Sequence, residues 1–508
     1  MNLSNSSISE INKLYKSKEL KPSEVYEEVF TNASLSESII HAHLKLFQEE
    51  GIEASKLSDE RFAEGKQLSD LDGIPIAIKD NINLKNHETT CSSKILSNYV
   101  SPYDATVITK LRNSGVVFTG KTNLDEFAMG SSTENSAFGP TKNPWNPEHV
   151  PGGSSGGSAA VVSVGSALAS LGSDTGGSSG GSSSALAAKL TPATIGTDTG
   201  GSIRQPASFC GVVGFKPTYG TVSRYGLVAF ASSLDQIGPI TNSVEDAKII
   251  FNSIKGHDPL DATSIQDTSI EIPEDKTAKV GVIKELMEDG ISDESKNEVE
   301  KTIKLLEEQG NKVVEVSLPL TKMALSIYYL IAPAECSANL SRLDGVRYGS
   351  RESGETSYEM IENTRAEGFG EEVKKRILLG TYALSAGYYD AYYGQALKAR
   401  SLITKDFDNI FQEVDYLISP TTPTPAFKFG EKTENPLEMY MSDLCTIPAN
   451  LAGLPAISIP TGLSNQNMPL SIQLMSPART DSSLLKFSEK LEKLVAFNQR
   501  TPLLKDMK

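Results

Sequence analysis

The sequence lacks the residue patterns that metal sites, disulfide frameworks and membrane spans require. Its four cysteines are scattered, and none belongs to a Cys-x-x-Cys pair or a cysteine and histidine cluster. No apolar run reaches the roughly eighteen residues of a membrane span, and residues 1–16 lack a basic and then apolar signal segment. We therefore expect a soluble cytoplasmic protein without a metal ion, whose thiols stay reduced: Cys91, Cys210, Cys336 and Cys445.

Basic residues are also in deficit. The chain has 48 lysines and arginines against 64 acidic residues, a formal charge of −16, and no long basic run. Such a chain lacks the positive surface that grips a phosphate backbone. If RNA takes part in its function, we expect a partner protein to hold the RNA.

Histidine is scarce, which bears on the choice of a catalytic base. The five histidines lie in undistinguished settings, so a Ser-His-Asp triad is poorly supported. Lys79 is a better candidate, because isoleucines alternate before it in a strand pattern and a buried lysine can be neutral near pH 7. The competing interpretation is a structural lysine paired with Asp80 or another carboxylate.

Helix and strand patterns alternate along the chain, which predicts a parallel or mixed sheet. Asp104 is expected to cap a helix that leads to a buried strand at residues 115–119. Residues 115–122 also match the phosphate-loop pattern Gly-x4-Gly-Lys-Thr, but the spacer is the strand itself, which disfavours a nucleotide site. From residue 279 to 316 a further strand, helix and strand follow. At 508 residues the chain is long enough for one large α/β domain with additions.

One pattern of glycine and serine occurs twice between Pro151 and Tyr219. Residues 152–178 and 176–202 each run from Gly-Gly-Ser-Ser-Gly-Gly-Ser through an apolar stretch to Asp-Thr-Gly-Gly-Ser, offset by 24 residues. The apolar stretches predict a helix and then a strand, so the glycine segments are tight turns rather than a flexible linker. Such turns let backbone amides converge on an anion, while a serine at the turn exit presents its hydroxyl to the same point.

Three motifs together resemble the amidase signature family of Ser-Ser-Lys hydrolases. They are Gly-Ile-Pro-Ile-Ala-Ile-Lys-Asp around Lys79, the Gly-Gly-Ser-Ser-Gly-Gly-Ser turn, and Asp198-Thr-Gly-Gly-Ser-Ile-Arg-Gln-Pro206. The resemblance implies one large α/β domain with a central mixed sheet covered by helices on both faces. We expect an N-terminal helical layer, the signature core with the duplicated unit, and the remainder of the same domain, at residues 1–70, 71–255 and 256–508.

Four further stretches resemble the ammonia-producing subunits of tRNA-dependent amidotransferases within that family. This likeness implies that the chain hydrolyses glutamine, and that the ammonia converts Glu-tRNA(Gln) to Gln-tRNA(Gln) in an ATP-dependent reaction. The implied complex is a heterotrimer with a B and a C subunit, in which the B subunit holds the tRNA, ATP and Mg²⁺, and this chain holds no cofactor. Two alternatives remain, a stand-alone amidase for another small amide and a catalytically impaired scaffold. The stretches are Lys121–Asn135, Lys216–Gly220, Ser223–Gly238 and Ser419–Pro425.

The resemblance also assigns roles to single residues. Ser202 is the expected nucleophile, because only the second Asp-Thr-Gly-Gly-Ser is followed by Ile-Arg-Gln-Pro, and a second serine carries protons between it and Lys79. Arg376 is expected to hold the α-carboxylate of glutamine, and Asp443 its α-ammonium group. The oxyanion is expected to bind backbone amides around Thr199, Gly200 and Gly201.

The duplication leaves the bridging serine undecided between Ser178 and Ser154. If residues 176–202 are the working unit, Ser178 bridges and about one unit upstream is extruded at the glycine-rich junction. We favour this arrangement, since an insertion bounded by turns leaves the helix and the strand intact. In the alternative, Ser154 keeps its position relative to Lys79, and the extra residues bulge out before Ser202.

Overall fold

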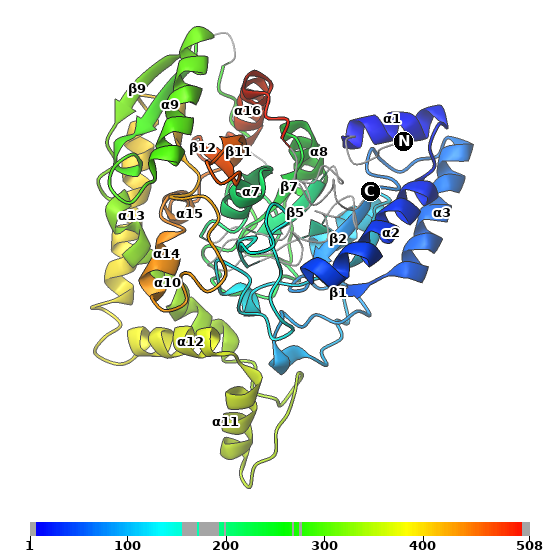
Figure 1. Cartoon of the computed structure of the whole chain (residues 1–508). Coiled ribbons are helices and arrows are strands. Elements are labelled where there is room, and N and C mark those ends of the chain that lie inside the picture. Colours follow the sequence, from blue (N-terminus) through cyan, green and yellow to red (C-terminus); the bar gives the residue numbers. More distant parts are fainter. Residues whose placement is uncertain are drawn as a thin grey trace.

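The fold is organised around one mixed β-sheet, to which the described parts of the chain contribute twelve strands (Figure 1). This computed structural model describes residues 7–154, 170–171, 193–197, 200–266, 269–273 and 277–499. The strands lie in the order β1-β3-β2-β4-β5-β7-β6-β11-β12-β10-β8-β9. Their bounds are His43–Leu46 (β1), Pro75–Lys79 (β2), Val117–Thr122 (β3), Ser170–Leu171 (β4), Ala193–Thr197 (β5), Val213–Lys216 (β6), Ile237–Thr241 (β7), Lys279–Ile283 (β8), Lys312–Val316 (β9), Tyr416–Pro420 (β10), Ala456–Leu463 (β11) and Pro469–Met475 (β12).

Both parallel and antiparallel pairs occur in the sheet, so the predicted α/β class with a mixed sheet is confirmed. Strands β3, β2, β4 and β5 run parallel, as do β10, β8 and β9, while the pairs from β5 through β7, β6, β11 and β12 to β10 are antiparallel. Helices make the crossovers that parallel neighbours need, with α4 (Thr106–Asn113) between β2 and β3, and α9 (Asp293–Glu308) between β8 and β9.

The first part of the chain packs three helices beside β1 at the edge of the sheet. They are α1 (Ile8–Ser17), α2 (Pro22–Ile40) and α3 (Gln48–Glu64). Helix α1 begins with a reciprocal capping box between Ser7 and Glu10, and α2 has a proline at its first residue, where the missing N–H costs nothing. The sequence predicted only helices here and missed strand β1, which pairs with β3.

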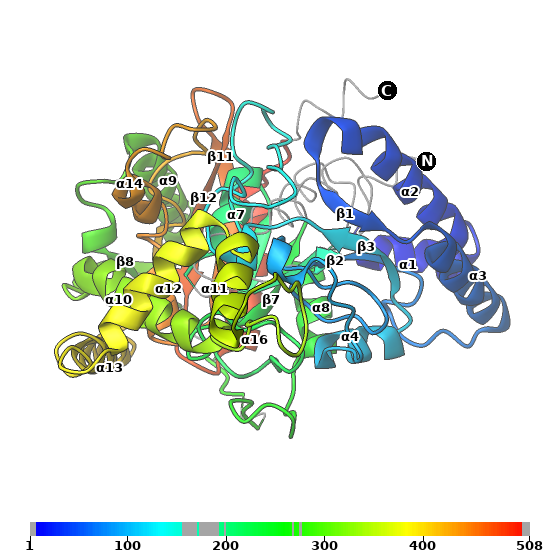
Figure 2. The same ribbon diagram turned by 90° about the horizontal axis from the view of Figure 1, so that it is seen from below.

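The later helices cover the sheet and one of its ends. Helices α11 and α12 lie at the bottom of Figure 1, and Figure 2, which views the molecule from below, shows them in front of the sheet. Among the described residues, no helix is long and apolar enough to cross a membrane. The bounds are Arg204–Cys210 (α7), Val244–Ile254 (α8), Thr321–Leu340 (α10), Ser357–Gly368 (α11), Glu371–Leu384 (α12), Tyr393–Ile410 (α13), Pro436–Met441 (α14), Ile447–Leu451 (α15) and Asp481–Val495 (α16), with 3₁₀ turns at Lys94–Leu96 (η2), Glu126–Ala128 (η3) and Lys284–Leu286 (η4).

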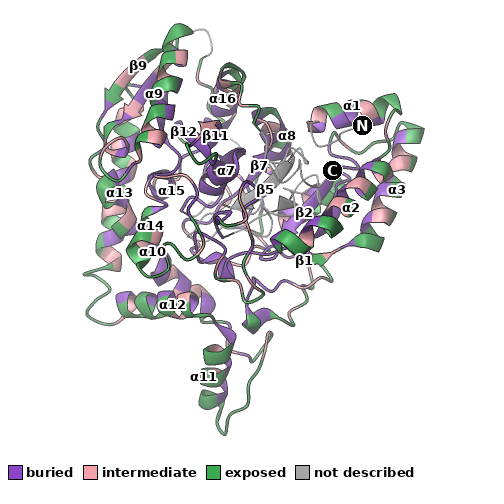
Figure 3. Ribbon diagram, viewed as in Figure 1, coloured by how far each residue is buried: buried purple, intermediate pink, exposed green. Residues whose placement is uncertain are grey.

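Adjacent residues of the central strands belong to two different hydrophobic clusters. Ile418 of β10 joins the cluster that contains residues of α9 and α16, whereas Leu417 joins the cluster that contains residues of α10, α13 and α15. Because successive strand residues point to opposite faces, helices cover both faces of this part of the sheet. Figure 3 shows strands such as β2, β7 and β12 buried and the outer sides of the helices exposed, so the central strands provide a rigid base for side chains at their ends.

Both units of the sequence repeat supply a strand to the sheet. Strand β4 comes from the first unit and β5 from the second, and the two lie side by side in parallel. Strand β4 also pairs with β2, which ends at Lys79, and β5 pairs with β7. In their shared register Leu171 is opposite Ile195, its equivalent 24 residues later.

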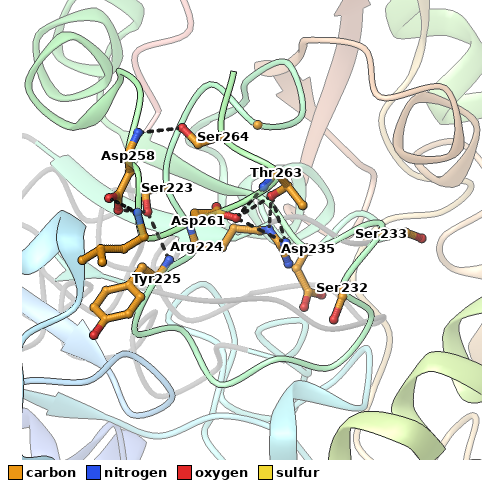
Figure 4. A network of polar contacts seen from close by, with 12 residues as sticks. Ser223, Arg224, Tyr225, Ser232, Ser233, Asp235, Asp258, Asp261, Thr263 and Ser264 are labelled. Atoms are coloured by element: carbon orange, nitrogen blue, oxygen red, sulfur yellow. Dashed lines mark hydrogen bonds and ion pairs between the residues drawn. The ribbon is translucent and has the colours of Figure 1, made fainter. Parts of the chain in front are cut away.

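The polar connection from residue 258 is pinned to the preceding loop by a network of hydrogen bonds (Figure 4). The Asp258 carboxylate accepts a bond from the Ser223 hydroxyl, and Asp261 accepts one from the Arg224 backbone amide at 2.8 Å. Thr263 accepts a further bond from the Arg224 guanidinium at 2.9 Å. The connection at residues 258–264 is therefore an ordered loop, held by side chains.

Asp80, which follows Lys79, forms a buried ion pair with Lys121 rather than with Lys79. The two charged atoms are 2.8 Å apart, and both side chains are 2% exposed. Lys121 also donates to the backbone oxygens of Ile82 and Glu88. Because this lysine lies inside strand β3, the phosphate-loop match is a coincidence of sequence.

We predict that Asp80→Ala lowers the free energy of unfolding by about 3–5 kcal/mol, because it leaves the Lys121 ammonium buried without its counter-charge. Urea unfolding measures this as a lower midpoint. The matched control is Arg112→Ala, which breaks the half-exposed pair with Asp104 and should cost less than about 1 kcal/mol. Equal losses for the two variants would contradict the prediction.

Candidate active site

Lys79 stands at the end of β2 with its side-chain nitrogen directed at Ser154. Its side chain is completely buried, and Nζ donates to Ser154 Oγ at 2.8 Å. Both neighbours of β2 in the sheet run parallel to it, which fixes the end of the strand. The structure therefore brings together the lysine and the serine named in the alternative register, whereas Ser178 lies outside the described residues.

The turn that carries Ser154 is held by the loop at residues 130–135. Gly152 has φ of 85°, a left-handed conformation that favours glycine, and its carbonyl accepts a bond from Thr133 Oγ1 at 2.9 Å. A Cβ on Gly153 would be only 2.4 Å from the Ser132 amide nitrogen. Glycine is thus required for the turn to lie against this loop.

Ser202 is buried between a glycine pair and helix α7. Gly201 has φ of 143°, and its carbonyl accepts a bond from the Gln205 amide at 2.7 Å, at the start of α7. The carbonyl of Gly200 accepts a bond from Thr446 Oγ1 at 2.6 Å. These bonds fix the backbone immediately before Ser202, although Thr199, the third residue predicted for the oxyanion hole, lies outside the described residues.

Arg376 projects from α12 into a buried aromatic box. Its Nε donates to Glu372 Oε1 at 2.8 Å, one helical turn earlier. The guanidinium carbon lies 5.5 Å from the ring centre of Tyr329 and 5.7 Å from that of Tyr440, and these two rings stack on each other at 4.0 Å. Aromatic faces attract a guanidinium, so the box orients the cation.

Charge pairing keeps this arginine ionised despite its burial. Burial by itself would lower the pKa of Arg376, but the Glu372 carboxylate beside it raises the pKa well above its usual value. In the same way burial alone would raise the pKa of Glu372, but the Arg376 charge outweighs burial and leaves that pKa lowered. Both groups are therefore charged at neutral pH, which suits the binding of a carboxylate ligand.

Asp443 lies beside the loop at residues 130–135. It is fully buried, and its Oδ2 accepts a bond from Ser131 Oγ at 3.1 Å. Its backbone carbonyl accepts a bond from Thr446 Oγ1, the hydroxyl that also bonds Gly200. One threonine thus ties the Asp443 segment to the turn before Ser202.

A chain of contacts joins the remaining parts of the site. A Cβ on Gly200 would lie 3.0 Å from the hydroxyl of Tyr328, so the phenol packs on the turn before Ser202. The Tyr328 ring is 5.1 Å from that of Tyr329, which covers Arg376. The predicted residues Ser202, Arg376 and Asp443 therefore border one buried region, although they come from distant parts of the sequence.

Among the described residues, no group of three histidine, cysteine, aspartate or glutamate side chains is placed to hold a metal ion. The charges at the site come from lysine, arginine and carboxylate groups. This arrangement suits a small substrate with a carboxylate and an amine, and a serine and lysine proton relay.

Comparison with known sequences identifies the family. The sequence model of the amidase family matches residues 24–178 and 175–485. The chain belongs to the amidase signature family. The two matched segments overlap at 175–178, where the two repeat units of this amidase meet.

The amidase is similar over almost its full length to proteins that share one name. The A subunit of the glutamyl-tRNA(Gln) amidotransferase from Carboxydothermus hydrogenoformans is 53% identical over 98% of this chain and 99% of its own. The protein of that name from Halothermothrix orenii is 49% identical over 99% and 100%. The crystal structure of the Thermotoga maritima protein of that name has a TM-score of 0.70 at 41% identity, covering 94% of this chain and 95% of that one.

A solved bacterial aryl acylamidase of the same family has a TM-score of 0.80 at 22% identity, covering 98% of each chain. At that identity the likeness shows the amidase fold alone. The predicted architecture, an amidase signature domain built on a mixed sheet, is thereby confirmed.

Sequence reasoning missed the residues that surround the predicted ones in this amidase. Tyr329 and Tyr440 enclose Arg376, and Glu372 pairs with it. Only Glu372 carried a local signal, since an acid four residues before an arginine on a helix predicts an ion pair. The tyrosines come from α10 and α14, and no sequence spacing predicts that these helices meet α12.

Proposed function

We propose that this amidase is the glutamine-hydrolysing subunit of a tRNA-dependent amidotransferase, which supplies ammonia for the conversion of Glu-tRNA(Gln) to Gln-tRNA(Gln). The observation that carries the proposal is the buried hydrogen bond between Lys79 and Ser154, the proton relay that Ser-Ser-Lys amide hydrolysis needs. About half the residues are identical to the amidotransferase relatives over nearly the whole chain, which favours the tRNA-dependent reaction over simple amide hydrolysis.

In the proposed mechanism Ser202 is the nucleophile. Its oxygen forms a bond to the side-chain amide carbon of glutamine, and its proton passes through Ser154 toward Lys79. The relay returns a proton to the leaving nitrogen as the carbon–nitrogen bond breaks, which releases ammonia and leaves a glutamyl ester. Water then adds to the ester, the bond to Ser202 breaks, and glutamate leaves.

The turn before Ser202 would stabilise the negative oxygen of each tetrahedral intermediate. Backbone amides around Gly200, Gly201 and Thr199 are the proposed donors. The bonds from Thr446 and Gln205 hold the carbonyls of this turn, and so favour a fixed direction of its amides. Donors fixed in advance need no reorganisation when the charge develops.

Two opposite charges would select a free amino acid. The Arg376 guanidinium binds the α-carboxylate of glutamine, and Asp443 binds the α-ammonium group. A simple amide lacks both groups and gains neither interaction, so it binds with a smaller free energy than glutamine. This argument favours glutamine over the small amides that a stand-alone amidase would hydrolyse.

The remaining parts of the reaction belong to partner subunits. A formal charge of −16 does not suit a chain that grips tRNA by itself, so we propose that a B subunit binds the tRNA together with ATP and Mg²⁺. A small C subunit would complete the heterotrimer. This chain contributes ammonia and needs no cofactor of its own for that step.

The test is ammonia release from glutamine by the chain purified with its B and C subunits, followed by formation of Gln-tRNA(Gln) when Glu-tRNA(Gln) and ATP are supplied. We expect both products from the complex. Hydrolysis of simple amides by the isolated chain, without any dependence on its partners, would instead support a stand-alone amidase.

A further prediction concerns the clamp. Arg376→Lys is expected to raise the KM for glutamine about 10–100-fold with a smaller change in kcat, because lysine lacks the planar fork that pairs with a carboxylate. Initial rates of ammonia release by the complex measure both constants. The matched control is Lys375→Met, which removes the half-exposed neighbour that also pairs with Glu372 and should leave KM within about twofold. An unchanged KM in the arginine variant would argue against the clamp.

A further inference from the structure

The turn after β3 places two neighbouring buried acids, Asp125 and Glu126, against different parts of the site. Asp125 immediately precedes the 3₁₀ turn η3, and Glu126 begins it. The next two residues, Phe127 and Ala128, have φ of 48° and 58°, a left-handed conformation that side-chain-bearing residues seldom adopt. Such a conformation persists where surrounding contacts enforce it, and it is frequent at functional sites.

Asp125 faces the turn that carries Ser154. Its Oδ2 accepts a bond from the Thr133 amide at 2.8 Å, and its Oδ1 accepts one from the Asn135 amide at 3.0 Å. Its own N–H donates to the carbonyl of Ser154. A Cβ on Gly153 would be 1.9 Å from Asp125 Oδ2, so the turn packs directly on the carboxylate.

Glu126 faces the helix that carries the arginine clamp. Its Oε2 accepts a bond from the amide of Gly370 at 2.7 Å, and its Oε1 accepts one from the Ser93 hydroxyl. Gly370 is the N-cap of α12, so this carboxylate fixes the start of the helix that projects Arg376. A negative group at a helix N-terminus is also favourable for the helix itself.

Both carboxylates are held by hydrogen bonds to the surrounding loops and to α12. Their four oxygens each accept a hydrogen bond, and both side chains are at most 3% exposed. Burial raises the pKa of Asp125 to about 6 and that of Glu126 to about 7, which reflects the desolvation of both groups. Neither acid forms part of the proposed relay or clamp, so their placement calls for a different role.

We propose that Asp125 and Glu126 are positioning residues, which lock the Ser154 turn and the Arg376 helix to one rigid turn and so set the distance between the proton relay and the substrate clamp. Asp125 acts through Ser154 and therefore supports the chemical step. Glu126 acts through α12 and therefore supports glutamine binding. This division rests on the proposed function, and it gives the two neighbours different kinetic signatures.

Asp125→Asn is expected to lower kcat about 10–100-fold with KM within about twofold. An amide has a single acceptor oxygen, so one of the Thr133 and Asn135 N–H groups would face a donor, and a small displacement of a relay group can cost about 100-fold in rate. Thr133→Val, which removes the bond to the Gly152 carbonyl and keeps the backbone N–H, is the milder second variant and should lower kcat about 3–10-fold. A kcat close to wild type in both variants would overturn the role of Asp125.

Glu126→Ala is expected to raise the KM for glutamine about tenfold with kcat within about threefold. Glu126→Gln should restore KM to near the wild-type value, because its amide can accept from Gly370 and donate to the Ser93 hydroxyl. The control for losing a buried carboxylate elsewhere is Asp246→Asn in α8, which should leave both constants within about twofold. Equal KM values for Glu126→Ala and wild type would overturn the role of Glu126.

A readout without catalysis separates this inference from the proposed function. All variants are made in the full complex, and amide hydrogen exchange is followed at Gly370 and the first turn of α12. Exchange at least tenfold faster in Glu126→Ala, but not in Glu126→Gln, supports the lock, and unchanged exchange in Glu126→Ala overturns it. Absence of ammonia release by the wild-type complex would reject the proposed function. The exchange rates of Glu126→Ala and Glu126→Gln would still decide whether Glu126 fixes the start of α12.

Discussion

Ser202→Ala is expected to reduce glutamine hydrolysis by the complex about 10⁴-fold or more. The substitution removes the oxygen that forms the glutamyl ester, and loss of a serine nucleophile in hydrolases that work through an acyl intermediate has effects of this size. Burial of Ser202 beside the Gly200–Gly201 turn supports this role. Steady-state ammonia release gives the rate, and KM for glutamine should change little, because the clamp is intact.

The sequence itself provides the matched control for this experiment, because Ser178 closes the first repeat unit as Ser202 closes the second. Ser178→Ala is expected to keep most of the wild-type rate. If Ser178→Ala is inactive and Ser202→Ala is active, the nucleophile belongs to the first unit and our assignment is wrong. A burst of ammonia with accumulation of a glutamyl ester on the chain, located by peptide mass, would identify the serine directly.

Ser154→Ala is the second large effect, and we expect it to lower kcat about 10²–10⁴-fold. Without Ser154 Oγ the Lys79 side-chain nitrogen loses the bond at 2.8 Å, and the proposed relay lacks the hydroxyl between the nucleophile and the lysine. KM for glutamine should stay near the wild-type value, because Ser154 does not contact Arg376 or Asp443 in the proposed arrangement. Single-turnover measurements would place the loss in ester formation.

The arrangement in which Ser178 is the bridge makes the opposite prediction. If Ser178 were the bridge, as the sequence alone favoured, Ser178→Ala would lose this activity and Ser154→Ala would retain it. Comparing each single variant with the double variant Ser154→Ala/Ser178→Ala also tests whether the two serines act independently of each other. Loss in the double variant no greater than in Ser154→Ala alone indicates one bridge rather than two.

The parts of the site that depend on local pattern could be predicted from the sequence. Alternating isoleucines indicated a strand that ends at Lys79, and the structure gives β2 that end. The β-α-β run from residue 279 follows equally from its periodicity. Such patterns depend only on residues that are close together in the sequence, so they can be recognised without knowledge of the fold.

Other expectations failed where tertiary contacts decide. Asp104 does not cap α4, which begins after Ala105, because its carboxylate is engaged by the Lys85 amide and the Arg112 side chain. Strand β1 has only four residues between two helices, and it exists through pairing with β3. Neither outcome could follow from propensity, since each depends on partners outside the segment itself: Lys85 and Arg112 for Asp104, and β3 for β1.

The approach of Arg376, Tyr329 and Tyr440 is a stronger case of the same kind. Their helices lie at separate places in the chain, and resemblance to a family supplied only the arginine. The contact between Lys79 and Ser154 is likewise a tertiary one, which sequence periodicity cannot predict. The choice between Ser154 and Ser178 as the bridge stays a prediction, because Ser178 lies outside the described residues.

The pairing of β4 with β5 gives the duplication a simple geometric meaning. Leu171 and Ile195 are the same position of the repeat, so strands β4 and β5 are related by a shift of about one interstrand spacing, ~4.8 Å, across the sheet. A duplication of this length therefore adds one parallel strand to the sheet and keeps the order of the strands on either side of it. Strand β4 pairs with β2 on one side and with β5 on the other, so the additional strand lies inside the sheet and leaves neither neighbour with an unpaired edge there.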